Sequence, residues 1–349
     1  MYIAKNITIY IRMKNLIYFL LILLSTRTFS QELINNESLK FTIKSKNNSI
    51  DFIVYDNNLD QKKPVLLWCQ GSLPYPIYVK RAYDYWMIGG GISNFNTDYI
   101  RKYYHLVVIS MPETPVIVNE DEINKSYWYN GKSKDKTMPS IAFQKADYLE
   151  NYVERGIAVL EFLRKQKWVD NSKLIVAGHS QGSKVASKIA TNYKYVSKVG
   201  LFATNPFGRI DQNIRTYRKM AEKKEISWEE AEKYIEEEYQ IFRDALDENK
   251  VKEKPYLLAW KSFSVPLIDD WLTLNKPIYL AYGTNDIAAD LCDLVPLYFM
   301  KEEKSNLKLK KYIDSDHNFF KINNNGRPDY ENPQWPEVMN SFIDWTLTK

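Results

Sequence analysis

The chain has 349 residues, of which 45% are hydrophobic and 26% are charged. This length and composition allow a large buried core, so an intrinsically disordered protein is excluded. Lys and Arg number 48 and Asp and Glu 43, but four of the basic residues and none of the acidic ones fall within residues 1–30. The rest of the chain is close to neutral, which argues against an electrostatic nucleic-acid-binding protein.

The amino terminus has the pattern of an export signal. The apolar run LIYFLLILL covers residues 16–24, and the small residues Thr28 and Ser30 precede a cleavage position before Gln31. This run is much shorter than the about 20 residues that a membrane-spanning helix requires. We therefore expect residues 1–30 to be removed as a signal peptide, leaving an exported protein, periplasmic or secreted, without a stable membrane anchor.

A second methionine, Met13, begins a complete signal of its own. We interpret residues 1–12 as lying upstream of the true start, although Met1 and Met13 both remain candidates.

The sequence contains two cysteines, Cys69 and Cys292, and three histidines. Nothing in the sequence brings the two thiols within bridging distance, so we expect both to be free and buried. So few histidines, with no C-x-x-C pair, make a metal site improbable, and we expect none.

Alternating apolar and polar residues on both sides of an Asn-Asn-Ser turn predict a β-hairpin over residues 39–55. Continuous apolar runs then predict strands buried on both faces of a parallel sheet. They are PVLLWCQ (64–70), HLVVISMP (105–112) and KLIVAG (173–178). Further strands are predicted over VSKVGLFATNP (196–206), PIYLAYG (277–283) and LKLKKYI (307–313). Amphipathic helices are predicted over residues 143–166 and 335–347. The alternation of strands and helices predicts an α/β fold with a mostly parallel central sheet.

A change of composition marks an insertion after the sixth predicted strand. From residue 209 to about 254 the chain is rich in charged helix formers, and Ser227 with Glu230 has the spacing of a helix capping box. We interpret this charge as a solvated face and the segment as a helical cap over the sheet. The expected parts of the mature chain are a first core segment (31–208), the cap (209–260) and a second core segment (261–349).

Ser180 lies in GHSQG, a G-x-S-x-G pattern placed directly after a predicted buried strand and before a predicted helix. A nucleophilic serine at such a turn needs a strained backbone, and Gly178 and Gly182 leave room for it. The pattern therefore predicts a nucleophile elbow.

A serine hydroxyl needs a general base, which directs attention to the histidines. His105 begins a strand and so lies at the wrong edge of the sheet, and His179 is adjacent to the serine on the turn. His317 follows the last predicted strand, where the carboxyl ends of parallel strands meet. We expect His317 to be the base rather than a structural histidine.

The base in turn needs a carboxylate to orient it. Asp286 follows the strand over residues 277–283 by a short turn and is the best candidate, with a helix N-cap as its alternative role. Asp290 and Asp293 lie further along in a predicted helix. Asp316 is adjacent to His317, where the geometry is awkward.

The order Ser180, Asp286, His317 resembles that of the α/β-hydrolase superfamily. The resemblance covers most of the mature chain, and GHSQGSKVA and YGTNDIAA look most like its dienelactone hydrolase and prolyl oligopeptidase branches. It implies an oxyanion hole that uses the backbone N–H of Gln181 and a second donor from the loop WCQGSLPYP. Ser72 is the expected second donor, with Leu73 as the alternative.

Two further segments are interpreted from composition. The glycine run 89–91 follows no predicted strand and is expected to be a flexible loop. The aromatic segment SYWYNG (126–131) is a candidate wall for the substrate cleft, or else packs the insertion against the core.

These residues predict an exported serine hydrolase that needs no cofactor and cleaves a carboxylic ester through an acyl-enzyme. The alternatives are a peptidase acting on short peptides, a thioesterase, and a binding protein that keeps the fold without catalysis. The expected partner is a small-molecule or short-peptide substrate, and the oligomeric state is left open.

Overall fold

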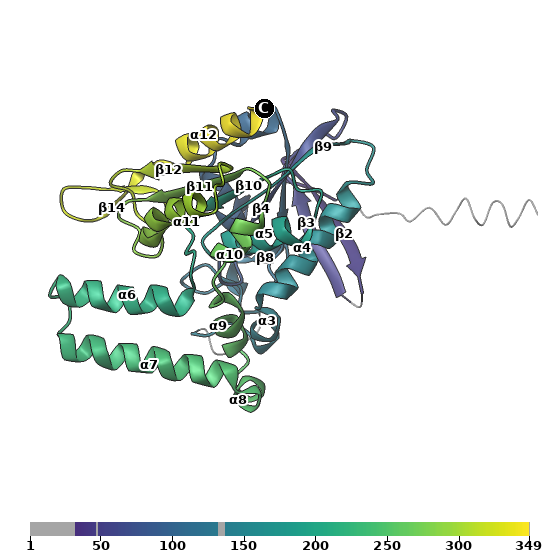
Figure 1. The fold of residues 1–349 in the computed structure, drawn as a ribbon. Helices are drawn as coiled ribbons and strands as arrows, with labels where there is room; N and C mark the ends of the chain where they lie inside the picture. The colour runs from purple at the N-terminus through teal and green to yellow at the C-terminus, as the bar shows by residue number, and fades with distance from the viewer. Residues whose placement is uncertain (1–31, 47, 132–136, 349) are drawn as a thin grey trace, which may run out of the picture.

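The computed structural model describes residues 32–46, 48–131 and 137–348, which form α helices, 3-10 helices and three sheets. Within these ranges the largest sheet has nine strands, which pair in parallel from β7 to β12 and antiparallel at the β1 edge (Figure 1). In spatial order the strands are β1 (Glu32–Ile34), β2 (Ser38–Ser45), β3 (Asn48–Val54), β7 (His105–Ile109), β4 (Lys63–Cys69), β9 (Val169–His179), β10 (Lys198–Phe202), β11 (Ile278–Gly283) and β12 (Leu307–Tyr312). The predicted hairpin and the mostly parallel sheet are both confirmed.

The central strands are buried on both faces, as their continuous apolar sequences predict. In β4, Val65 and Leu67 pack into one hydrophobic cluster and Leu66 and Trp68 into the other, and none is more than 1% exposed. Helices cover both faces because each cluster needs an apolar partner layer. One face carries α4 (Leu149–Leu163), α5 (Gln181–Asn192), α10 (Ile268–Thr273) and α11 (Val295–Lys301), and the other carries α2 (Thr97–Arg101) and α12 (Trp335–Leu347).

The helix predicted over residues 143–166 is wrong in one respect, because the structure divides it into α3 (Ile141–Ala146) and α4. Asp147 and Tyr148 between them leave the helical conformation. The Asp147 carboxylate accepts hydrogen bonds from Tyr152 Oη at 2.8 Å and Gln181 Nε2 at 3.2 Å, and these tertiary bonds hold the break. Sequence periodicity carries no information about such partners.

The predicted insertion, residues 209–260, contains α6 (Arg209–Glu222), α7 (Trp228–Leu246), α8 (Glu248–Glu253) and the start of α9 (Leu257–Phe263), which runs past the predicted end. Helices α6 and α7 form an antiparallel pair that projects away from the sheet (Figure 1). The predicted capping box is present, since Ser227 Oγ accepts from Glu230 N and Glu230 Oε2 accepts from Ser227 N. The buried Glu238 of α7 accepts from Asn213 of α6 at 2.9 Å, which ties the two helices together.

The glycine run 89–91 does not match its predicted role as a loop that follows no strand. It follows a strand of a small second sheet after one intervening residue and forms a kink at the start of a 3-10 segment, with positive φ at all three glycines. The carbonyl of Gly90 accepts from Trp68 Nε1 at 3.1 Å, so the segment is fastened to β4. The elements of this region are β5 (Tyr78–Lys80), β6 (Tyr85–Met87), η1 (Gly89–Asn94), β8 (Ile117–Asn119) and η2 (Glu120–Glu122).

The carboxyl-terminal part of the chain contains η3 (Asp290–Leu294) and a two-stranded sheet of β13 (Phe320–Ile322) and β14 (Pro328–Pro333). Cys292 lies in η3, and both it and Cys69 are free and buried. Burial raises the pKa of the Cys69 thiol to about 12, so it stays protonated.

The predicted signal peptide, its cleavage position before Gln31 and the choice between Met1 and Met13 all lie outside the described residues. Across residues 32–348, with the two gaps noted above, we find no helix with the length and apolar character needed to span a membrane.

Candidate active site

Ser180 occupies a sharp turn between β9 and α5. Its backbone angles are φ 55° and ψ −123°, a conformation that a residue with a side chain adopts only where the surroundings impose it. A Cβ on Gly178 would lie 2.2 Å from the carbonyl oxygen of Gly182, and a Cβ on Gly182 would lie 2.1 Å from that of Cys69. Both flanking positions therefore exclude any side chain, as the G-x-S-x-G spacing predicts.

The predicted base, His317, and the predicted acid, Asp286, lie beside this turn. His317 Nε2 is 2.9 Å from Ser180 Oγ, and His317 Nδ1 is 2.9 Å from Asp286 Oδ2. Because a carboxylate accepts, Nδ1 carries the proton and Nε2 is left as the acceptor for the serine hydroxyl. This geometry therefore selects the His317 tautomer that a general base requires, with the proton on Nδ1.

Asp286 is 3% exposed, and its other oxygen accepts from Ala288 N at 2.9 Å. The competing acids serve elsewhere: Asp290 binds Arg215 and Lys219, and Asp293 binds Tyr282 and Lys311. Asp286 is therefore the acid that the structure brings to His317.

Asp316, although adjacent to His317 in sequence, accepts from the backbone N–H groups of Asn318 and Phe320. It shapes the loop that carries the base rather than binding the imidazole.

Two opposing effects act on the pKa of His317. Burial lowers the pKa, but the hydrogen bond to Asp286 and the charge of that carboxylate outweigh burial, so the pKa is raised above its usual 6.5. The neighbouring His179 behaves differently, because burial, together with the charge of His317, lowers its pKa to about 3. His179 is thus neutral at physiological pH, and its Nε2 donates to the main-chain oxygen of His317 at 2.8 Å.

The expected oxyanion donors lie next to the nucleophile. Gln181 is the first residue of α5, where a backbone N–H has no acceptor within its own helix. Ser72 and Leu73 both line the cavities that meet at Ser180. Leu73 has a positive φ of 73°, so the loop after β4 turns sharply at this point.

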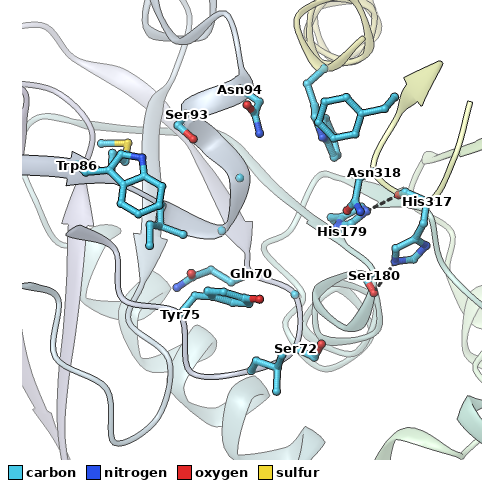
Figure 2. Close-up of a pocket in the computed structure, with 18 residues that line it drawn as sticks. Gln70, Ser72, Tyr75, Trp86, Ser93, Asn94, His179, Ser180, His317 and Asn318 are labelled. Atoms are coloured by element: carbon cyan, nitrogen blue, oxygen red, sulfur yellow. Dashed lines mark hydrogen bonds between the residues drawn. The ribbon is translucent and has the colours of Figure 1, made fainter. Parts of the chain in front are cut away.

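One chamber, with a volume of about 560 Å³, opens from Ser180 and His317 (Figure 2). Trp86 and Tyr75 lie across it from His317, and Phe320 and Trp335 also line it. Among its lining side chains in the described part of the chain we find no Asp, Glu, Lys or Arg. This chamber is suited to a neutral group with aromatic or other apolar surface.

The segment 126–131 does not line this chamber, contrary to the expectation of an aromatic wall there. Tyr129 borders a separate cavity of about 600 Å³ beside α3. Tyr127 instead packs edge-on against Trp86, with ring centroids 5.1 Å apart, and so supports the wall from outside.

A second chamber of about 370 Å³ meets the first at Ser72, Leu73 and Ser180, which line both. Unlike the first, it is lined by charged groups from the core and from the first turn of α6. Its charged and aromatic lining consists of Asp147, Lys184, Arg209, Trp260 and Phe263.

Sequence reasoning missed the residues that surround the triad. The sequence indicates only that His179 is adjacent to Ser180 and that Arg209 belongs to a charged insertion. The basic residue directly after the Gly208 turn, at the start of α6, is the one signal that could have identified Arg209. The described residues include no cluster of three or more His, Cys, Asp or Glu able to hold a metal ion.

These observations define an α/β-hydrolase fold with a Ser-His-Asp constellation at the carboxyl edge of its sheet, and the comparisons with known proteins agree on the fold. The chain is similar to a putative dienelactone hydrolase from Klebsiella pneumoniae, with a TM-score of 0.54 and 11% identity over 89% of this chain and 98% of that one. It is also similar to acetyl xylan esterase 1 from Thermoanaerobacterium, with a TM-score of 0.50 and 13% identity over 92% and 88%. The expected fold is thereby confirmed.

A third similar structure is the acylaminoacyl peptidase of Pyrococcus horikoshii, with a TM-score of 0.50 and 13% identity over 94% of this chain. The chain spans 43% of that peptidase, and 62% of a 2,6-dihydroxy-pseudo-oxynicotine hydrolase that superposes with a TM-score of 0.49. The sequence matches no protein-family model and no curated protein sequence. The named neighbours are all hydrolases, but at these identities the likeness concerns the fold.

Proposed function

We propose that this protein is a serine hydrolase that cleaves a carboxylic ester by acyl transfer to water. The observation that carries the proposal is the continuous hydrogen-bond relay from Asp286 through His317 to Ser180, with 2.9 Å at each step. The strained backbone at Ser180 supports the proposal, because residues held in such conformations cluster at active sites.

In the first half-reaction, Ser180 Oγ attacks the ester carbonyl carbon while its proton passes to His317 Nε2. The carbonyl oxygen becomes an oxyanion, which the backbone N–H groups of Gln181 and Ser72 stabilise. The tetrahedral species collapses as the C–O bond to the alcohol breaks, and His317 gives the proton to the departing oxygen. Asp286 stabilises the imidazolium throughout without itself taking the proton.

In the second half-reaction, water replaces the alcohol. His317 takes a proton from the water, the resulting hydroxide attacks the acyl carbon, and the Ser180 ester bond breaks. The proton returns to Oγ, and the carboxylic acid leaves. Every proton is accounted for by His317, so the described residues suffice for the reaction.

We also propose that the protein is exported after cleavage before Gln31 and that residues 209–260 act as a cap over the site. The apolar run and small residues of the amino terminus support the first part. Arg209 and Trp260 line a chamber that reaches Ser180, which supports the second.

Covalent labelling tests the activated serine. Residues 31–349 are treated with a fluorophosphonate probe beside Ser180→Ala and His317→Ala, with circular dichroism as the folding control. The expected result is labelling of the wild type that is lost in Ser180→Ala and strongly slowed in His317→Ala. No labelling of folded wild type, together with no turnover of small aryl esters, would leave a non-catalytic binding protein.

A substrate panel then separates ester cleavage from the alternatives. Simple aryl esters, a length series of peptide amides and a matched thioester are compared by kcat/KM. The proposal expects the esters to be preferred. A preference for peptide amides that increases with peptide length would identify a peptidase instead.

A further inference from the structure

The two chambers that meet at Ser180 differ in charge, and this difference identifies the substrate class. We propose that the second chamber binds the acyl half of the substrate and that Arg209 holds a carboxylate on it. The substrate would then be a half-ester: a dicarboxylic acid esterified at one end to a neutral alcohol with apolar or aromatic surface. This inference rests on the proposed hydrolase function.

The position of His317 assigns the two halves to their chambers. A general acid must lie within hydrogen-bond distance of the atom that it protonates, and His317 protonates the departing alcohol oxygen. His317 lines the first chamber and is not among the residues that line the second. The alcohol therefore leaves through the first chamber, and the acyl group occupies the second.

The first chamber suits a neutral alcohol. Its walls include Tyr75, Trp86 and Phe320, and its polar side chains, such as Asn94 and Asn318, are uncharged. A charged alcohol would lose its hydration here without gaining an ionic partner.

Arg209 gives the second chamber its specificity. Its guanidinium lies over the rings of Trp260 and Phe263, at 5.3 and 5.6 Å from their centroids, and Nη2 donates to Gln181 Oε1. Among the described residues it forms no ion pair with a carboxylate within 4.0 Å. Burial lowers the pKa of Arg209, and the nearby charge of Asp147 only partly offsets this effect. A ligand carboxylate that accepts from the remaining N–H donors would therefore stabilise the charged guanidinium further. The planar guanidinium also matches a carboxylate in a bidentate geometry.

The other charged groups of the chamber favour an anion over a cation. Lys184 is 6% exposed and donates to the carbonyl of Phe263 at 2.7 Å. Burial and the charge of Arg209 lower its pKa to about 7, so it is partly protonated near neutral pH, and a bound anion would favour its charged form. Among the described residues, Asp147 is the one acid in the lining, and its Oδ1 already accepts from Tyr152 and Gln181. Because the Asp147 carboxylate could instead bind an acyl group that carries an ammonium, the test includes esters of that kind.

The test compares matched esters of one alcohol. Mono-4-nitrophenyl adipate and suberate carry a terminal carboxylate, and analogues of equal length carry a carboxamide or an ammonium in its place. We expect the wild type to show kcat/KM at least tenfold higher for the carboxylate esters than for the carboxamides, with the ammonium esters poorest. Uncatalysed hydrolysis is subtracted for each ester.

Substitutions at Arg209 test whether this residue causes the preference for carboxylate esters. Arg209→Gln should bring the carboxylate-to-carboxamide ratio close to one, and Arg209→Lys should keep part of it, which covers the case in which the Gln variant is unstable. Arg218→Gln is the matched control, because Arg218 also lies on α6 but has a half-exposed side chain that pairs with Glu232. Its ratio should equal that of the wild type.

Binding to Ser180→Ala, measured by calorimetry with the same esters, separates this inference from the proposed function. The carboxylate ester should bind at least tenfold more tightly than the carboxamide even where no turnover occurs. Hydrolysis of all three esters at equal rates would overturn the inference and leave the hydrolase intact. A preference for the ammonium ester would overturn the inference and indicate that Asp147, rather than Arg209, binds the acyl group. Equal binding of all three esters by Ser180→Ala would also overturn the inference.

Discussion

His179 Nε2 donates a hydrogen bond to the main-chain carbonyl oxygen of His317, 2.8 Å away. The residue before Ser180 thereby holds the loop that carries His317, the proposed base. Because burial keeps the pKa of His179 at about 3, the imidazole is neutral and Nε2 keeps its proton above that pH. The edge-on contact with Trp335, at 5.3 Å between ring centroids, fixes the ring plane.

Removing this bond should slow catalysis without weakening substrate binding. His179→Phe keeps an aromatic ring but loses the donor, so we expect kcat to fall roughly ten- to a hundredfold, as a small misplacement of a catalytic group does, with KM little changed. His179→Gln, whose amide can still donate, should recover part of the rate. Equal losses in both variants would point to a packing defect, which thermal unfolding would reveal.

Asp286 should be far more important than its neighbouring acids. Asp286→Asn favours the wrong tautomer of His317, and we expect kcat to fall by about 10⁴-fold. Asp293→Asn is the control, since Asp293 pairs with Lys311 and its side chain is 54% exposed. A similar loss in both variants would contradict the assignment of Asp286.

The pH dependence of kcat/KM should reflect His317 as a base. The base acts when neutral, so activity should rise with pH through an apparent pKa above 6.5, because Asp286 raises the pKa of His317 despite its burial. Asp316 adds to this effect, whereas His179 is neutral over this range. Rates with a neutral aryl ester between pH 5 and 9 measure the profile, and a flat profile would exclude His317 as the base.

Ser72 is expected to act through its backbone. Ser72→Ala keeps the N–H, so kcat should stay within about threefold of the wild type, whereas loss of an oxyanion donor typically costs about a hundred- to a thousandfold. A loss of that larger size in a folded Ser72→Ala would identify the hydroxyl as the donor.

Gly182 and Gly71 allow two alanine substitutions to be compared, one without room for a Cβ atom and one with room. A Cβ at Gly182 would lie 2.1 and 2.3 Å from the carbonyl oxygens of Cys69 and Gln70, so Gly182→Ala should lower the free energy of unfolding by roughly 3 kcal/mol. A Cβ at Gly71 would lie 3.9 Å from its nearest neighbour, the His179 carbonyl oxygen, so Gly71→Ala should be tolerated. Urea denaturation of the two variants measures the difference, and equal stabilities would contradict it.

Much of the sheet and the triad positions were predictable because they depend on local patterns. A strand buried on both faces is a continuous apolar run, and the carboxyl ends of parallel strands meet at one edge. Ser180 and Asp286 each follow such a strand, and His317 follows β12, the partly exposed edge strand beside β11, so the proximity of the three follows from strand order.

The features that were not predictable depend on contacts between distant segments. The break at Asp147 is held by partners on α4 and α5, and the packing of Gly90 against Trp68 fixes a segment that the sequence suggests is loose. Arg209 reaches the site because α6 begins at the chamber, and composition shows only that α6 is charged.

At Gly182 the backbones of α5 and the loop after β4 touch directly, so the oxyanion loop cannot slide past the nucleophile without displacing the centre of the sheet. Helices α6 and α7 project from the sheet (Figure 1), α7 packs on both α6 and α9, and Arg215 and Lys219 of α6 pair with Asp290 of the core. A tilt of the α6–α7 pair would therefore change the shape of the second chamber beside Arg209, while Ser180, His317 and Asp286 kept their places.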